Sequence, residues 1–266
     1  VGWCLAHGGA KARAVEAKIS CPYGMSADEP DELLCEGAEL VRFEQYDAFM
    51  EKQHAMLACV GVHDEDGACA YLPALEAELQ RYQEQAYVLD PFLERLVTPV
   101  AQTMRAQVLE SGCMCMAPVA RLLYMYTKVR GYKVVSRFFP HQVREMPLLL
   151  DALERFESPT WECLYVLLLW LPSGMLVPFP MDRGTPSPSE RIHRLCARFL
   201  SRPGKERDAA SIVLGRLYAR EECELFFSAF LQDAEQATAS LVPTGVLQTL
   251  CAFVKQADAS LIRAHY

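Results

Sequence analysis

Apolar residues recur at the three- and four-residue spacing of amphipathic helices along most of the chain from Pro73 onward. Prolines and capping residues interrupt this pattern. Proline has no N–H to donate and is therefore tolerated in the first turn of a helix. The sequence holds no series of alternating strands with hairpin turns. The pattern predicts an all-α protein whose helices begin near Pro73, Pro91, Pro118, Pro147, Pro159, Ser189, Glu206, Glu221 and Val246.

Four helix starts are evenly spaced. The second helix of each apparent pair begins near Pro118, Pro159, Pro203 and Pro243, at intervals of 41, 44 and 40 residues. Two-helix HEAT and armadillo units repeat at about 40–47 residues. Such a pair does not bury its apolar face alone, so neighbouring pairs stack and leave a ridge free for partners. The spacing predicts a HEAT/armadillo-like α-solenoid, a right-handed stack of antiparallel helix pairs.

The pattern divides the chain into three parts. Residues 1–36 carry little periodicity and are expected to form a leader that is poorly ordered or unrelated to the rest. Residues 37–72 are expected to hold one helix and an exposed acidic loop, Gly61–Gly67, and residues 73–266 the helical repeats. Within the repeats, Pro178–Ser189 is the longest predicted loop, because prolines and a glycine interrupt any regular structure there.

Individual capping residues and prolines give sharper expectations. Asp90 is placed to cap the helix that follows it, and Pro99 lies inside that helix, where a kink or an early stop is expected. Ser189 is placed to cap the helix Glu190–Leu200. One helix is expected over Val246–Leu261.

Composition narrows the function classes. The 266 residues carry 26 Lys and Arg against 34 Asp and Glu, a net charge of −8. Nucleic-acid binders normally present a basic face, so this balance argues against a nucleic-acid partner. The most apolar run, Leu164–Leu171, is far shorter than the about 20 residues that a membrane span needs. It is therefore predicted to be a buried helix, and no membrane span is expected.

The 11 cysteines are scattered along the chain without a C-x-x-C pair. Zinc sites usually need close pairs of ligands, so the count does not indicate a metal site. An odd number of thiols on apolar helices suits a reducing compartment, and a cytoplasmic location is expected. Four cysteines lie in apolar helical patterns and are predicted to be free and largely buried: Cys163, Cys196, Cys223 and Cys251.

Signatures of catalysis are missing from the sequence. The 6 histidines lie far apart, and neither H-E-x-x-H, nor G-x-S-x-G, nor a glycine-rich phosphate loop occurs. No catalytic, cofactor-binding or metal-binding residue is therefore expected. Beside a protein-binding scaffold, one open alternative is an all-helical enzyme whose site is assembled from scattered polar residues.

The most unusual local string is Lys128-Val-Arg-Gly-Tyr-Lys133, which places three cations and an aromatic ring around a glycine. One interpretation is a helix end, because glycine ends helices and cations favour the carbonyl terminus. The other is a contact patch for an acidic partner, since Arg and Tyr are frequent anchors of interfaces. The candidate partner contacts are Lys128, Arg130, Tyr132, Lys133 and Arg137.

Aromatic residues after this string are predicted to serve the core. One of Phe138 and Phe139 is expected to pack under the turn at Pro140, because adjacent residues do not face the same helical stripe. Trp161 and Trp170 are expected to be core residues of a helix that is apolar on all sides.

Several strings are more specific than the helical pattern. They are Tyr82-Gln-Glu-Gln85, Leu89-Asp-Pro91, Tyr126-Thr-Lys-Val-Arg-Gly-Tyr-Lys133, Arg137-Phe-Phe-Pro-His141, Thr160-Trp-Glu162, Leu167-Leu-Leu-Trp-Leu171 and Arg207-Asp-Ala-Ala210. Together, and in this order, they resemble the N-terminal region of the tubulin-folding cofactor D family. The resemblance covers roughly residues 75–217. The family more often has Leu at position 138, and no resemblance is found before about residue 36.

The resemblance implies a chaperone role. Family members take β-tubulin from the cytosolic chaperonin and join cofactors E and C and an Arf-like small GTPase, and the α/β-tubulin dimer is assembled or taken apart on that platform. The assembly stimulates GTP hydrolysis by tubulin, so these proteins are GTPase activators without being enzymes alone. The implied location is the cytoplasm and the microtubule cytoskeleton. No residue-level site is carried over from the family to this sequence.

The alternative within the same fold is an unrelated HEAT or armadillo scaffold, such as a transport adaptor or a phosphatase scaffold. Tubulin is acidic and so is this chain, so no long-range attraction between them is expected. Binding to tubulin would then come from shape and apolar contact, with local cations offsetting the repulsion.

Overall fold

A computed structural model describes residues 42–109, 115–155, 159–176, 179–237 and 243–264. The expected leader, residues 1–36, lies outside these ranges. Every regular element within the described residues is a helix, and no strand occurs among them, which confirms the predicted all-α class. The α-helices are α1 (Tyr46–Gly61), α2 (Glu65–Arg81), α3 (Leu93–Leu109), α4 (Met116–Arg130), α5 (Tyr132–Val135), α6 (Met146–Arg155), α7 (Trp161–Met175), α8 (Pro188–Ala197), α9 (Lys205–Tyr218), α10 (Glu224–Ala237), α11 (Thr244–Val254) and α12 (Ala259–Ala264). Short 3₁₀ helices are η2 (Ala86–Phe92), η3 (Ser136–Phe138), η4 (Val143–Glu145) and η5 (Glu221–Cys223).

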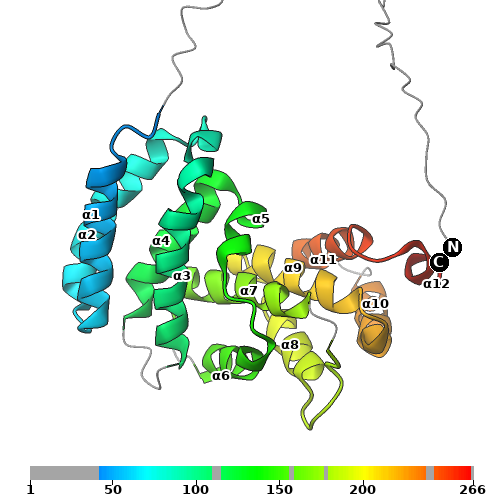
Figure 1. The fold of residues 1–266 in the computed structure, drawn as a ribbon. Coiled ribbons are helices and arrows are strands. Elements are labelled where there is room, and N and C mark those ends of the chain that lie inside the picture. Colours follow the sequence, from blue (N-terminus) through cyan, green and yellow to red (C-terminus); the bar gives the residue numbers. More distant parts are fainter. Residues whose placement is uncertain (1–41, 110–114, 156–158, 177–178, 238–242, 265–266) are drawn as a thin grey trace, which may run out of the picture. The chain divides into compact units, whose positions relative to one another are not determined.

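The helices stack in two layers, as Figure 1 shows from blue α1 and α2 to red α11. In one layer α2, α4, α7, α9 and α11 pack each against the next, and in the other α1, α3, α6 and α8 do the same. Helices of the two layers also pair, α1 with α2, α3 with α4, α6 with α7 and α8 with α9. This arrangement confirms the predicted α-solenoid of helix pairs, while the right-handedness of the stack stays a prediction. The helices α4, α7, α9 and α11 begin within two residues of the prolines that set the predicted spacing.

Several polar side-chain contacts between helices join residues that are 40 positions apart in the sequence. Four of these contacts link one helix pair to the next, whereas Asp90–Arg130 links η2 to the end of α4. The pairs are Asp90–Arg130, Arg105–Glu145, Asp151–Arg191, Asp208–Gln248 and Arg216–Gln256.

Helix α7 is deeply buried, because it lies between α4 and α9. Trp170 is buried as predicted, and its indole N–H donates to the carbonyl oxygen of Pro140. Phe139 packs into the core at this turn, while Phe138 is half-buried. Trp161 corrects the prediction, since 38% of it is exposed. It begins α7 directly after the cap Thr160 and packs on the surface against Tyr124, with ring centroids 4.6 Å apart.

Two prolines lie inside helices where the sequence predicted a start or a stop. Pro73 lies within α2, which begins earlier, at Glu65, because the Asp64 side chain accepts a hydrogen bond from the N–H of Gly67. The acidic loop is therefore shorter than predicted, and the expected boundary at residue 73 falls within a helix. A kink or an early stop was expected at Pro99, and the early stop does not occur, since α3 continues to Leu109. Buried side chains on both sides of Pro99 hold the helix together.

Three predicted caps and ends also differ. Asp90 caps no helix, because it lies in η2 and its carboxylate pairs with Arg130. Helix α8 is capped by Ser187 rather than Ser189, whose buried hydroxyl donates to the Met181 carbonyl oxygen over 2.9 Å. The predicted helix Val246–Leu261 breaks into α11 and α12, because the Asp258 carboxylate accepts backbone N–H bonds that start a new turn.

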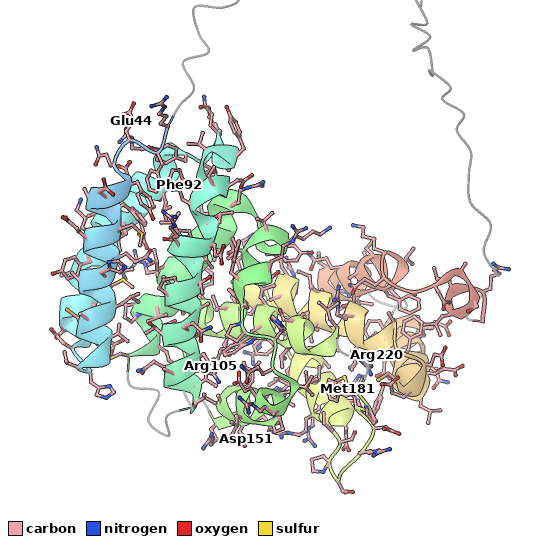
Figure 2. The ribbon with its side chains drawn as sticks, viewed as in Figure 1. Glu44, Phe92, Arg105, Asp151, Met181 and Arg220 are labelled. Carbon is pink, nitrogen blue, oxygen red and sulfur yellow. The ribbon has the colours of Figure 1, made fainter. Side chains whose placement is uncertain are left out.

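Arg220 fixes the described part of the loop between α7 and α8. Its guanidinium donates to the carbonyl oxygens of Met175 and Phe179, over 3.0 and 2.6 Å. Arg220 follows the end of α9, and Figure 2 labels it together with Met181 of this loop. The loop that carries the predicted proline-rich segment is therefore attached to the end of α9, and residues 177 and 178 lie outside the description.

Candidate partner-binding groove

The chain turns sharply at Gly131, between α4 and α5. Gly131 has φ of 92°, a conformation that favours glycine, and its N–H donates to the Thr127 carbonyl oxygen over 2.9 Å. The cations of the last turn, Lys128 and Arg130, lie at the carbonyl end of α4, where the helix dipole favours positive charge. The helix-end interpretation of this string is therefore confirmed.

The structure divides the five candidate contacts into two groups. Arg130 is engaged inside the protein, because its guanidinium holds both carboxylate oxygens of Asp90, one of them over 2.7 Å. This bond lowers the pKa of Asp90, although burial opposes it. Lys128 is exposed next to this pair. Tyr132, Lys133 and Arg137 instead line a groove on the other side of the turn.

The groove has a volume of about 810 Å³ and is bordered by five elements from separate parts of the sequence, of which only α5 and η3 are contiguous. Its first wall is α5 with η3, and α7, α9 and α11 complete it. These three long helices belong to the same layer of the solenoid. The groove therefore lies on the surface that a stack of repeats leaves available for partners.

Cations from both sides face the groove. Lys133 and Arg137 are exposed on the first wall, and neither forms an ion pair within the described residues. Lys255 is exposed at the end of α11. Arg216 of α9 is half-buried, and its Nε donates to Gln256 over 2.7 Å. Burial lowers the pKa of Arg216, while Tyr132 opposes this effect.

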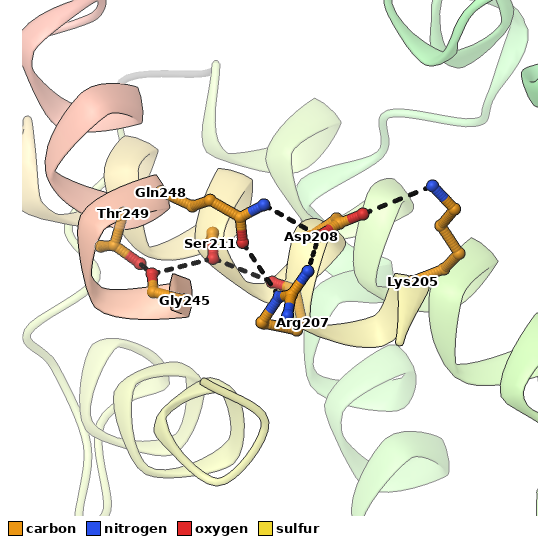
Figure 3. Close-up of polar contacts among 7 residues, drawn as sticks. All are labelled: Lys205, Arg207, Asp208, Ser211, Gly245, Gln248 and Thr249. Carbon is orange, nitrogen blue, oxygen red and sulfur yellow. Dashed lines mark hydrogen bonds and ion pairs between the residues drawn. The ribbon is translucent and has the colours of Figure 1, made fainter. Parts of the chain in front are cut away.

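Asp208 is the acidic residue of the groove lining, and its charge is engaged by neighbours (Figure 3). Arg207 and Gln248 each donate to one carboxylate oxygen over 3.0 Å, and Lys205 lies 3.5 Å from the other. Burial raises the pKa of Asp208, but the bonds from Gln248 and Arg207 prevail and lower it. The carboxylate therefore stays ionised and is held by α9 and α11 together.

The same close-up shows how α9 and α11 are joined beside the groove. The Ser211 hydroxyl of α9 shares its one proton between the Arg207 and Gly245 carbonyl oxygens, at 2.9 and 3.1 Å, and within α11 Thr249 donates to the same Gly245 oxygen over 2.8 Å (Figure 3). The Arg207-Asp-Ala-Ala210 string thus has a structural use, since it attaches α11 to the stack.

The apolar part of the lining is unusually exposed. Leu176 after α7 and Leu247 of α11 both border the groove, and 69% and 52% of them are exposed. Cys251 also borders it, which corrects the prediction that this thiol is buried; Cys163, Cys196 and Cys223 are free and buried as predicted. The groove therefore combines apolar surface with positive charge.

Sequence reasoning found the α5 wall but missed the opposite one. Arg216, Cys251 and Lys255 are ordinary helix residues in the sequence, and only the stacking of α9 and α11 places them against α5. A partial signal existed, because Arg216 and Gln256 are separated by the repeat length. That spacing indicates neighbouring helices but not which face they share.

Within the described residues, no three His, Cys, Asp or Glu side chains come together to hold a metal ion. None of the described helices has the length and apolarity that crossing a membrane requires.

Comparisons with known proteins agree with the sequence resemblance. A family model described as tubulin-specific chaperone D-like, ARM repeat, matches residues 79–238. The tubulin-folding cofactor D of Schizosaccharomyces pombe is 28% identical over 182 residues, which make up 66% of this chain and 16% of that protein. The chain therefore spans a small part of this relative's length. No solved structure was found to match.

Proposed function

Because the chain belongs to the family of tubulin-specific chaperone D-like proteins, we propose that it captures β-tubulin released by the cytosolic chaperonin. In this proposal, cofactors E and C and an Arf-like small GTPase join it, and the α/β-tubulin dimer is assembled or taken apart on that platform. GTP hydrolysis is then stimulated in the tubulin of the assembly and needs no active site in this chain. The proposed location is the cytoplasm, with a link to the microtubule cytoskeleton.

The observation that carries this proposal is the family match from the end of α2 through α10. It confirms the resemblance and supports a tubulin chaperone role. The chain covers 16% of its curated relative, so the steps that involve other cofactors and GTP are proposed for the whole protein of which such repeats are a part.

Capture from a cytosolic extract tests the proposal. The chain is immobilised and exposed to extract in which β-tubulin is newly translated and labelled, and the retained proteins are identified by mass spectrometry. We expect β-tubulin to be enriched over a HEAT-repeat control protein of similar size and net charge. Recovery of transport cargo or phosphatase subunits without tubulin would instead support the unrelated scaffold.

A further inference from the structure

We propose that the groove between α5, α7, α9 and α11 binds an acidic segment of a partner protein, one that carries apolar side chains between its carboxylates. The inference deepens the proposed function, on which it rests for the identity of the protein that supplies this segment. The chemistry of the segment follows from the groove itself.

Charge is the first argument. Lys133, Arg137, Arg216 and Lys255 border the groove, against the one carboxylate of Asp208. That carboxylate already accepts bonds from Arg207 and Gln248, so it repels an incoming anion less than a free one would. The whole chain carries −8, and a positive groove in an acidic protein is a local feature that selects acidic ligands.

Apolar surface is the second argument. Leu176 and Leu247 are large apolar side chains that remain mostly exposed at the groove, and Ile212 of the same lining is half-buried. Burial of apolar area is what gives an interface most of its free energy, while surface ion pairs contribute little. A purely acidic ligand would leave this area in water. A nucleic acid would place charged phosphates against the same apolar lining, which therefore favours a protein segment.

Shape is the third argument. Packed helices lie about 8–10 Å apart, so a groove that crosses α7, α9 and α11 is about 20 Å long. An extended chain covers that length with about six residues. A short segment with acidic and apolar side chains in alternation would place carboxylates toward the cations and apolar groups on the floor.

A synthetic peptide tests the groove without any assumption about tubulin. The probe is a fluorescent peptide of about 12 residues in which Glu alternates with Leu and Phe, enough to span the groove with a margin. We expect it to bind the chain, and a probe with Lys in place of Glu not to bind. The double variant Lys133→Glu, Arg137→Glu should weaken binding by about tenfold or more, since it replaces two contact cations with anions.

A matched variant separates local contact from net charge. Lys52 on α1 and Arg95 on α3 are exposed and do not border the groove. The variant Lys52→Glu, Arg95→Glu changes the net charge by the same amount and should leave peptide binding within about twofold. Equal losses in both double variants would overturn the proposal.

Cys251 reports the place of binding. Its thiol is exposed at the groove, whereas the exposed thiol of Cys69 lies on α2. We expect bound peptide to protect Cys251, but not Cys69, from maleimide, as measured by mass spectrometry. Binding without protection of Cys251 overturns the assignment of the groove. A polyuridine RNA that binds and protects as well as the peptide overturns the choice of a protein segment.

Other outcomes separate this inference from the proposed function. If the chain captures β-tubulin but the peptide does not bind, the groove assignment fails and the tubulin proposal stands. If the peptide binds but no tubulin is captured, the groove assignment stands and the tubulin proposal fails. If the free chain is a dimer that the Lys133→Glu, Arg137→Glu variant separates, a second copy occupies the groove and the partner segment is excluded.

Discussion

Gln53 shows how a single polar side chain fixes three helices. It is fully buried on α1, donates to the Leu96 carbonyl oxygen of α3 over 2.9 Å, and accepts from the Tyr126 hydroxyl of α4. A buried amide is tolerated when its donors and acceptors are paired. Tyr126 also begins the string that resembles the family, so that string has a structural use at its first residue.

Removal of the Tyr126 hydroxyl should therefore destabilise the protein. Tyr126→Phe leaves the Gln53 oxygen buried without a donor, and we expect a loss of about 1–3 kcal/mol in the free energy of unfolding, measured with urea. Tyr87→Phe, at a residue that is 64% exposed, is the control and should stay within about 0.5 kcal/mol. Equal effects of the two changes would contradict the role of Gln53.

Thiol reactivity should divide the cysteines by burial. Burial raises the pKa of Cys163 to about 11 and that of Cys223 to about 12, so at neutral pH both are almost wholly in the unreactive thiol form. We expect Cys163, Cys196 and Cys223 to react with maleimide only after denaturation, and Cys69 and Cys251 to react in the native protein. Rapid native labelling of Cys196 would contradict the packing of α8.

The pH dependence of stability should reflect His193. Burial lowers the pKa of His193 below its usual 6.5, although Asp233 opposes this, and its Nδ1 lies 2.9 Å from the Tyr218 hydroxyl. Below pH 6.5 the unfolded chain binds the proton that the folded protein resists, so stability falls as the pH falls. Urea unfolding should show a decrease between about pH 7 and about pH 5.5 that is smaller in His193→Gln. The depressed carboxyls, such as Asp90, titrate below this window.

Cys251 shows why residue-scale prediction failed where it did. Helix α11 carries apolar residues on all sides, so the helical period alone does not reveal which face is buried. The buried face holds Gly245, Val246, Thr249 and Phe253, and Cys251 lies on the opposite side. Cys163, Cys196 and Cys223 were predicted correctly because neighbouring elements cover their faces of the stack.

At the scale of elements, two glycines allow close packing around α11. Gly215 of α9 lies against α11, and Gly245 of α11 lies against Leu200 in the turn between α8 and α9. A Cβ at Gly245 would lie 2.4 Å from the Leu200 carbonyl oxygen, and one at Gly215 would lie 2.4 Å from the Ala252 side chain. The close approach lets the Ser211 hydroxyl of α9 reach the Gly245 carbonyl oxygen of α11. Glycine is required here for packing rather than for its backbone freedom.

Gly245→Ala should therefore weaken the attachment of α11. Backbone atoms must shift to admit the methyl group, and we expect a loss of about 1–3 kcal/mol in the free energy of unfolding. Hydrogen exchange measured on the variant and on the unchanged protein should show that the substitution accelerates exchange in α11 more than in α1 and α2. Gly61→Ala is the control, because a Cβ at the end of α1 meets nothing within 4 Å. Uniform loss of protection along the chain would argue against a local attachment.

Helix boundaries show what the sequence determines and what it leaves open. The start of α4 was predicted because Pro118 lies in its first turn, where no N–H is needed. Pro73 and Pro99 misled the prediction because the residues four positions earlier, Cys69 and Arg95, are exposed. Water reaches a carbonyl oxygen on an exposed face, and burial of the other face holds the helix together. Whether a proline ends a helix thus depends on packing that the local sequence does not contain.

At the scale of the whole molecule, the repeat length was predictable and the groove was not. The prolines are spaced at 41, 44 and 40 residues, and pairs such as Asp151–Arg191 and Asp208–Gln248 are separated by a similar 40 residues. The repeat length is thus visible in the sequence both in the spacing of helix starts and in the spacing of polar partners. The groove instead brings together Lys133 and Lys255, which lie three repeats apart, and no local pattern predicts that juxtaposition.

For an acidic partner, the net negative charge of the chain should be repulsive and the positive charge of the groove attractive. Varying the ionic strength distinguishes these two effects on binding. At about 10 mM salt the Debye length is about 30 Å, so a partner such as acidic tubulin meets the net charge of −8. At about 100 mM it is about 10 Å, and only the groove cations act at contact. We therefore expect the association rate constant for tubulin to rise between these concentrations, measured by stopped-flow fluorescence.

The short acidic peptide should behave differently, because its own small charge feels the groove more than the distant surface. Its affinity should fall steadily as salt rises, and the Lys133→Glu, Arg137→Glu variant should lose most of that dependence. If the tubulin association rate also falls steadily, the protein attracts acidic partners over long range, and its net charge is no guide to capture. If neither the tubulin association rate nor the peptide affinity depends on salt, the cations of α5 and η3 are ordinary surface charges, and apolar contact alone must hold the partner.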